Sequence, residues 1–242
     1  MNPANMKAMV LAAGLGTRMR PITETLPKPL VEIGGRTLLD RALDALEEVG
    51  VTDAVVNVHH LGSQIAAHCA DRACPHVTIS DETERLLDSA GGIVRALPLL
   101  GEAPFLILNA DTFWIDRGGK NLARLAASWN ASQTDMLLML VPVGNTTGHG
   151  TKTDFLIASD GRLIRAKGDP AGLVYAGAAI LDPAIFADAS LEPHSLNLYF
   201  DRAIEKGRLF GMVMDGHWIT VGTPEAIAEA ERAIDDRQPA NG

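Results

Sequence analysis

The sequence has few cysteines, few aromatic residues and no long apolar run. Cys69 and Cys74 are its two cysteines, too few for a disulfide framework. The longest apolar run, residues 136–143, is far shorter than the ~18 residues of a membrane helix and is typical of a buried strand. The opening Met-Asn-Pro-Ala-Asn-Met-Lys lacks the charged-then-apolar pattern of a secretory signal. These absences predict a cytoplasmic protein with no membrane partner.

Acidic residues outnumber basic ones by 30 to 21, which gives a formal net charge of −9. This balance disfavours a nucleic acid as the main partner, because nucleic-acid-binding domains carry a basic surface. The sign of the charge reverses near the start of the chain, where Glu24 and Glu32 are outnumbered by basic residues: Lys7, Arg18, Arg20, Lys28 and Arg36. We expect a small polyanion to bind to this segment.

The first half of the chain alternates buried strands with amphipathic helices. Apolar runs predict strands over residues 8–13, 54–58, 77–80 and 105–108. Apolar residues at helical spacing predict helices between these strands, over residues 38–49, 63–69 and 91–100. The alternation predicts a Rossmann-like, doubly wound α/β fold, with a sheet covered by helices on both faces.

The second half of the chain adds strands without this alternation. Strands are predicted over residues 136–143, 155–158, 163–166, 174–181 and 209–214, and helices over 122–129, 196–205 and from Thr223 onward. Asp160-Gly161 marks a hairpin turn between two of the strands. We therefore predict one domain over residues 1–242 with a mixed sheet, extra antiparallel strands in its second half, and disorder over residues 238–242.

The segment richest in chemistry is Leu-Ala-Ala-Gly-Leu-Gly-Thr-Arg-Met-Arg-Pro at residues 11–21, followed by Pro-Lys-Pro-Leu at 27–30. A strand that ends in Gly14 and Gly16 lets backbone N–H groups approach an anion closely. Arg18 supplies a planar fork for phosphate oxygens and Lys28 supplies a point charge. Together these residues predict a polyphosphate-binding loop, although the two glycines alone are equally typical of a tight turn.

Two better-known phosphate-binding patterns do not match this loop. The dinucleotide fingerprint requires a third glycine where the chain has Met19. The P-loop requires Gly-Lys-Ser/Thr, whereas Gly119-Lys120 is followed by Asn121. The mismatch leaves a nicotinamide oxidoreductase poorly supported.

The loop and the Pro-Lys-Pro-Leu motif resemble the signature of the sugar-1-phosphate nucleotidyltransferases. The resemblance covers essentially the whole chain, because Asn109-Ala110-Asp111 is similar to the metal-binding step of the family and residues 221–224 to its closing strand-to-helix turn. The compact length, residues 87–92 and Gly216-His217-Trp218 most resemble the N-acetylmuramate 1-phosphate uridylyltransferases of bacterial cell-wall recycling.

The resemblance implies the transfer of a nucleotidyl group from a nucleoside triphosphate, UTP, to a sugar 1-phosphate, N-acetylmuramate 1-phosphate. Pyrophosphate would leave and Mg²⁺ would be the cofactor. Two alternatives stay open, namely a guanylyltransferase acting on mannose or heptose 1-phosphate and a non-catalytic protein that binds nucleotide sugars. The expected assembly is a monomer or a homodimer.

The resemblance also implies roles for individual residues. The nucleotide-binding half would cover about residues 7–112, and the sugar-binding half would cover about residues 113–236. Arg18 and Lys28 would be catalytic, and Asp111 would bind the metal. The nucleotide-binding set is Ala12, Ala13, Gly14, Gly16, Thr17, Glu82, Gly91, Gly92 and Asn109, with Gly91 and Gly92 forming a turn at one edge of the base and Asp88 as a further candidate. The sugar-binding set is Asp154, Lys167, Tyr175 and Gly177.

One position departs from the family pattern. Many relatives have a second metal-binding aspartate just before Val-Gly, whereas this chain has Thr220. A threonine hydroxyl is neutral and binds a hard cation more weakly than a carboxylate does. Three interpretations are open: Asp111, phosphates and water suffice, another carboxylate such as Asp116 or Asp201 assists, or the activity is lost.

Overall fold

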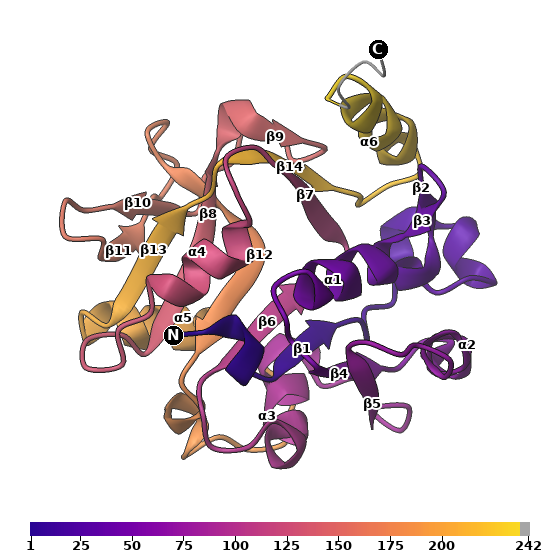
Figure 1. Cartoon of the computed structure of the whole chain (residues 1–242), viewed down its shortest axis with the longest axis horizontal. Coiled ribbons are helices and arrows are strands. Elements are labelled where there is room, and N and C mark those ends of the chain that lie inside the picture. Colours follow the sequence, from indigo (N-terminus) through magenta and orange to yellow (C-terminus); the bar gives the residue numbers. More distant parts are fainter. Residues whose placement is uncertain (238–242) are drawn as a thin grey trace.

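A nine-stranded mixed sheet runs through the centre of the protein (Figure 1), in a computed structural model that describes residues 1–237. Its first half is parallel and has the strand order β6-β1-β4-β5. These strands are β1 (Ala8–Leu11), β4 (Asp53–Val58), β5 (His76–Asp81) and β6 (Phe105–Asn109). The order reverses direction between β1 and β6, and the carboxyl ends of strands at such a reversal form a binding crevice.

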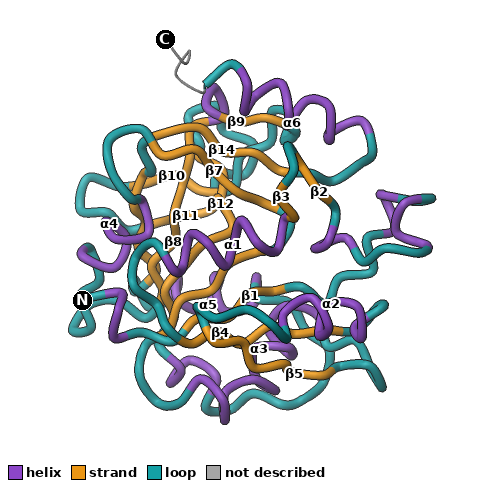
Figure 2. Tube along the Cα trace, turned by 45° about the vertical axis from the view of Figure 1, so that its right-hand side comes forward, coloured by secondary structure: helices purple, strands orange, loops and turns teal. Residues whose placement is uncertain are grey.

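Helices cover both faces of this sheet (Figures 1 and 2). One apolar cluster buries residues of α1 (Leu38–Glu47), α2 (Gly62–Cys69) and α4 (Asn121–Ala127) against one face. A second cluster buries residues of α3 (Asp88–Leu100) and α5 (Asn197–Glu205) against the other face. The predicted doubly wound α/β fold is therefore confirmed.

The second half of the chain extends the sheet with antiparallel pairs, as predicted. The central strand of this part is β12 (Leu173–Leu181), which lies antiparallel to β6 on one side and to β8 (Met136–Pro142) on the other. β13 (Leu209–Val213) lies parallel to β8. The predicted hairpin joins β10 (Phe155–Ile157) to β11 (Leu163–Arg165), and Gly161 in its turn has a φ of +85° that favours glycine.

The structure also contains a smaller, three-stranded sheet that the sequence did not predict. β14 (Gly216–Thr220) lies between β7 (Thr112–Asp116) and β9 (Thr146–Thr147), and α6 (Glu225–Asp235) packs over the same end of the molecule (Figure 2). Only Ala110 and Asp111 separate β7 from β6, and β9 spans two residues, so neither strand has an apolar pattern long enough to predict it. Short elements complete the described chain: the hairpin of β2 (Glu32–Ile33) and β3 (Arg36–Thr37), and the 3₁₀ turns η1 (Pro3–Asn5), η2 (Thr17–Met19), η3 (Ile22–Glu24), η4 (Lys28–Leu30), η5 (Val143–Asn145) and η6 (Pro183–Phe186).

The prediction that Gly91 and Gly92 form a turn is wrong. α3 begins at Asp88, so both glycines lie inside the helix, where they are buried. Both positions lack room for a side chain, since an added Cβ would lie 2.8 Å from the carbonyl oxygen of Glu192 at Gly91 and 2.5 Å from Oε1 of Glu82 at Gly92. The two glycines allow α3 to pack closely against Glu82 and Glu192. A pair of glycines in a sequence is equally typical of a turn, so the sequence does not distinguish the two cases.

The remaining sequence predictions concern the last residues of the chain and the absence of a membrane-spanning helix. Residues 238–242, for which disorder is predicted, lie outside the described part of the chain. Within residues 1–237, none of the helices combines the length and the apolar character needed to cross a membrane.

Gly216 is expected to be essential for the smaller sheet. Its φ is +140°, and an added Cβ would overlap the carbonyl oxygen of Ile115 on β7. We expect Gly216→Ala to lower the free energy of unfolding by about 2 kcal/mol or more, because the backbone pair must separate. Urea unfolding measures the effect, with Gly144→Ala as the control, since no atom lies within 4 Å of an added Cβ there. Equal stability of the two variants would contradict this account of β14.

Candidate active site

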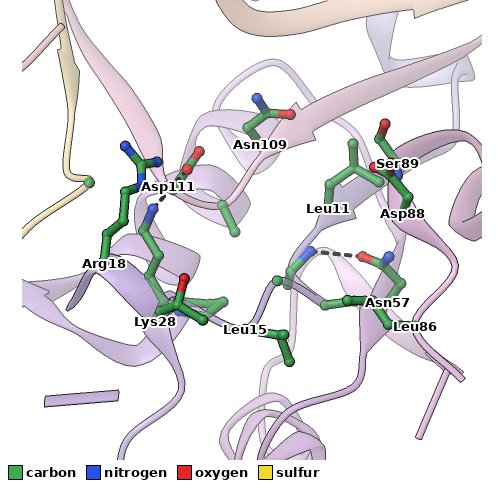
Figure 3. Close-up of a pocket in the computed structure, with 18 of the residues that line it drawn as sticks. Leu11, Leu15, Arg18, Lys28, Asn57, Leu86, Asp88, Ser89, Asn109 and Asp111 are labelled. Carbon is green, nitrogen blue, oxygen red and sulfur yellow. Dashed lines mark hydrogen bonds and ion pairs between the residues drawn. The ribbon is translucent and has the colours of Figure 1, made fainter. Parts of the chain in front are cut away.

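A cavity of about 630 Å³ opens at the carboxyl ends of β1, β4 and β6, where the strand order reverses. Figure 3 shows its two ends, with Arg18, Lys28 and Asp111 at one and Asn57, Asp88 and Ser89 at the other. The described residues that line it are Leu11, Ala12, Ala13, Gly14, Leu15, Gly16, Thr17, Arg18, Lys28, Pro29, Asn57, Leu86, Asp88, Ser89, Asn109, Ala110, Asp111, Pro193 and Gly222. The sequence-predicted phosphate loop thus forms one wall.

The charged end of the cavity is built around an ion pair. Lys28 Nζ lies 2.8 Å from Asp111 Oδ2, and the two side chains are 11% and 38% exposed. The amide of Val221 donates to the carbonyl of Asp111 at 3.0 Å, which ties the end of β14 to this position. Arg18 lies against Gly222, where an added Cβ would be 3.3 Å from its Nη1. The loop, the end of β6 and the turn after β14 therefore converge on one positively charged corner.

Local backbone geometry explains how the loop presents these cations. Gly16 has a φ of +62°, and an added Cβ would lie 2.9 Å from Cγ2 of Thr23. The hydroxyl of Thr23 donates to the carbonyl of Gly16 at 2.8 Å and fixes the turn. Lys28 begins η4 directly after Pro27, whose φ the ring restricts. The lysine is therefore held on a rigid backbone and aimed at Asp111.

The end of the cavity opposite the ion pair depends on a residue that sequence reasoning missed. Asn57 is buried one residue before the end of β4 and accepts a hydrogen bond from the amide of Ala12 at 2.7 Å. A polar residue near the carboxyl end of a buried strand is the signal that was available, because such ends meet at the binding edge of a parallel sheet. Leu15, Leu86, Ser89, Pro193 and Gly222 were also missed, since loop residues carry no periodic pattern.

Comparison with known proteins decides the family. Residues 7–237 match the nucleotidyl transferase family. The chain belongs to this family. It is 42% identical, over 97% of its length and 99% of the relative, to the N-acetylmuramate alpha-1-phosphate uridylyltransferase of Caulobacter vibrioides. It is 35% identical, over 93% of its length and 97% of the relative, to the protein of the same name from Neisseria meningitidis.

Solved structures show the same fold as this nucleotidyltransferase. The UDP-glucose pyrophosphorylase of Acinetobacter baumanii superposes with a TM-score of 0.80 at 19% identity, covering 97% of this chain and 95% of that one. HddC of Yersinia pseudotuberculosis, solved as a complex with GMP-PN, has a TM-score of 0.75 at 24% identity, covering 95% and 99%. At these identities the likeness is one of fold.

The predicted nucleotide-binding residues of this nucleotidyltransferase divide into two groups. The cavity wall contains Ala12, Ala13, Gly14, Gly16, Thr17 and Asn109. Glu82, Gly91 and Gly92 are absent from the described wall and are buried behind it. Glu82 is only 2% exposed, and its side chain is not part of the described cavity wall.

The predicted sugar-binding residues are more scattered. Gly177 lies beside the cavity with a φ of +73°, and an added Cβ would be 3.1 Å from Nδ2 of Asn109. Asp154 instead accepts a hydrogen bond from the amide of Tyr175 at 2.9 Å. Lys167 is exposed in the turn after β11. Gly177 therefore lies against Asn109, a residue of the described cavity wall.

The Tyr175 side chain is partly buried against the second apolar cluster of the nucleotidyltransferase. Its ring packs edge-on against Phe200 with centroids 5.5 Å apart. Within residues 1–237 its buried hydroxyl has no hydrogen-bond partner. Burial raises the pKa of this hydroxyl above its ordinary value. The residue thus packs against α5.

Asp116 and Asp201, the two carboxylates considered as additional metal ligands, form hydrogen bonds or ion pairs with other residues. Asp116 lies at the far end of β7 from Thr112, about 13 Å along an extended strand, and accepts from the amide of Asn121. Asp201 pairs with Arg165 at 2.7 Å. Across residues 1–237, no three His, Cys, Asp or Glu side chains are grouped to hold a metal ion. Asp111 is therefore the carboxylate that faces the charged end of the cavity.

Proposed function

We propose that this nucleotidyltransferase transfers the uridylyl group of UTP to N-acetylmuramate 1-phosphate and releases pyrophosphate. The observation that carries the proposal is the 42% identity to the Caulobacter vibrioides enzyme, which extends over 97% of the chain. The cavity supports it, because the phosphate loop, Lys28 and Asp111 stand at one end of a space of about 630 Å³. Such a volume suits a ligand of nucleotide size.

The chemistry requires no protein nucleophile. A phosphate oxygen of the sugar 1-phosphate, already ionised at neutral pH, attacks the α-phosphorus, and the bond from that phosphorus to the bridging oxygen of pyrophosphate breaks. Negative charge builds on the phosphate oxygens as the bonds exchange. Lys28 and Arg18, both in the cavity wall, neutralise this charge from fixed positions.

The proposal includes Mg²⁺, and the residues present suit this ion. Asp111 offers a carboxylate that is 38% exposed toward the cavity, and the ammonium of Lys28 already lies 2.8 Å from its Oδ2. Magnesium accepts one or two carboxylates and completes its shell with phosphate oxygens and water. Bound there, it would neutralise phosphate charge, while Thr220 would contribute at most a hydroxyl.

The guanylyltransferase alternative has weaker support. The probable mannose-1-phosphate guanylyltransferase 1 of Oryza sativa is 28% identical to this chain, which spans 62% of that protein. The alternative of a non-catalytic sensor rested on Thr220. The intact pair of Lys28 and Asp111 favours catalysis over that alternative.

Pyrophosphate release tests the proposal directly. With Mg²⁺, we expect UTP and N-acetylmuramate 1-phosphate to turn over at least about a hundredfold faster than GTP with mannose 1-phosphate. Chelation with EDTA should abolish the reaction, and added Mg²⁺ should restore it. Faster turnover with GTP and mannose 1-phosphate would overturn the choice of substrates. Binding of a UDP-sugar without any pyrophosphate release would favour the sensor instead.

A further inference from the structure

A buried chain of hydrogen bonds joins the two walls of the cavity at the end opposite Lys28 and Asp111. Asn57 Oδ1 accepts from the amide of Ala12 at 2.7 Å, and Asn57 Nδ2 donates to Glu82 Oε1 at 2.7 Å. The other carboxylate oxygen, Glu82 Oε2, accepts from the amide of Leu87 at 3.0 Å. Ala12 directly follows β1, and Leu87 directly precedes α3. Glu82 thus bridges two segments that are far apart in sequence.

The bridge is shielded from water and has no cationic partner. Glu82 and Asn57 are 2% and 3% exposed. Among the described residues, no lysine, arginine or histidine forms an ion pair with Glu82. The neighbouring Arg85 pairs with Glu192 instead. A buried carboxylate is costly unless hydrogen bonds satisfy it, so its position is held by the groups that donate to it.

The donors in this bridge allow only an acceptor at residue 82. The carboxylate must accept at both oxygens, from the Asn57 amide on one side and from the Leu87 backbone on the other. A glutamine accepts at one oxygen only, so its –NH₂ would face one of these two donors. Replacing one carboxylate oxygen of Glu82 by an –NH₂ group is therefore enough to break one hydrogen bond of the bridge.

Gly92 of α3 closes over the same bridge. An added Cβ at this position would lie 2.5 Å from Glu82 Oε1 and 2.8 Å from Asn57 Nδ2. The helix whose first residues, Asp88 and Ser89, line the cavity is thereby packed directly on the carboxylate. This contact supplies a steric means of disturbing the bridge without changing either polar residue.

We propose that Glu82 is a positioning residue for the nucleoside triphosphate. Acting through Asn57 and the Leu87 amide, it sets the separation between the β1 wall and the α3 wall. Figure 3 places Asn57, Leu86 and Asp88 at the end opposite Lys28 and Asp111. Since the phosphates belong with the cations, the nucleoside lies between these two walls. The inference rests on the proposed function only in that a nucleoside triphosphate occupies the cavity.

Glu82→Gln tests the bridge with a nearly isosteric change. We expect the Kd for UTP, measured by calorimetry without sugar phosphate, to rise about tenfold or more, because one donor loses its acceptor. The KM for UTP should rise in parallel while kcat changes less than about threefold, since the cations at the other end are untouched. Glu84→Gln is the matched control, because Glu84 is exposed in the same loop and should leave both constants unchanged.

A swap of the two polar groups provides a sharper test. In Asn57→Asp/Glu82→Gln, the new carboxylate accepts from the Ala12 amide and from the glutamine –NH₂, whose oxygen accepts from the Leu87 amide. The double variant restores every donor–acceptor pair with unchanged net charge. We expect its Kd for UTP to return to within about threefold of wild type, whereas Asn57→Asp alone opposes two carboxylates and binds weakly. Gly92→Ala should weaken UTP binding by the steric route.

The outcomes separate this inference from the proposed function. Wild-type UTP affinity in Glu82→Gln, or a double variant no better than either single variant, would overturn the bridge. Thermal unfolding checks that each variant is folded, and Gly92→Ala provides the test if Glu82→Gln is not. Binding of GTP in place of UTP would overturn the uridylyl proposal alone, because the same variants then test the bridge with GTP. A folded wild-type protein that binds neither nucleotide would overturn both.

Discussion

Replacing Lys28 with alanine is expected to lower kcat for pyrophosphate release by about a hundredfold or more in a protein that stays folded. The ammonium lies 2.8 Å from Asp111 at the charged end of the cavity, and its side chain is 11% exposed. Charge stabilisation by a group held in a water-poor site is worth much more than in open solvent. Steady-state kinetics with UTP and N-acetylmuramate 1-phosphate measure the loss.

A surface lysine provides the control for this variant. Lys120 pairs with Glu48 outside the cavity, where both side chains are about half exposed. Lys120→Ala removes the same charge and an ion pair, yet exposed pairs contribute little to stability. Its kcat should stay within about twofold of wild type. Near-normal turnover in Lys28→Ala would remove the lysine from the catalytic set and leave Arg18 as the remaining cation from the loop.

Replacing Asp111 with asparagine is expected to have an effect of similar size. The change keeps the size of the side chain but removes the charge that would hold Mg²⁺ and that now pairs with Lys28. We expect kcat to fall by about a hundredfold or more and the Mg²⁺ concentration needed for half-maximal rate to rise. Titration of the residual rate with Mg²⁺ separates these two effects.

Asp201→Asn is the control variant. It tests whether loss of any carboxylate, rather than loss of Asp111, changes the Mg²⁺ dependence. Asp201 pairs with Arg165, and that arginine lies 4.9 Å from the ring centroid of Phe155 beside α5. Its replacement should leave the Mg²⁺ dependence unchanged. A shift in Mg²⁺ dependence for Asp201→Asn, with none for Asp111→Asn, would show that Asp111 does not bind the metal.

The position of the predicted phosphate-binding loop in the cavity wall could be inferred from the sequence, because its residues are close together in the chain. Gly14, Gly16 and Arg18 lie within a few residues of one another, so chain geometry alone brings them together. Lys28 was equally accessible, since two prolines restrict the backbone on either side of it. The structure places all four residues in the wall of one cavity.

The residues that sequence reasoning misplaced depend on long-range packing. Glu82 was predicted to touch the nucleotide, but Asn57 stands between it and the cavity. Gly91 and Gly92 were predicted to form a turn, but they allow α3 to pack closely on Glu82 and on the segment around Glu192. Tyr175 was predicted to offer its hydroxyl to a sugar; its ring packs on Phe200, and the sugar contact stays a prediction.

The alternation of apolar runs by itself determined the doubly wound fold, since periodicity reports which face of each element is buried. The sequence also indicated the loop that lines the cavity, because the residues of this loop are close together in the chain. Only the tertiary structure decided which polar residues from distant segments meet, such as Asn57 with Ala12 and Lys28 with Asp111. The reason is physical: a pattern along one strand fixes its own faces, whereas the partner across a cavity depends on how the strands and helices pack together.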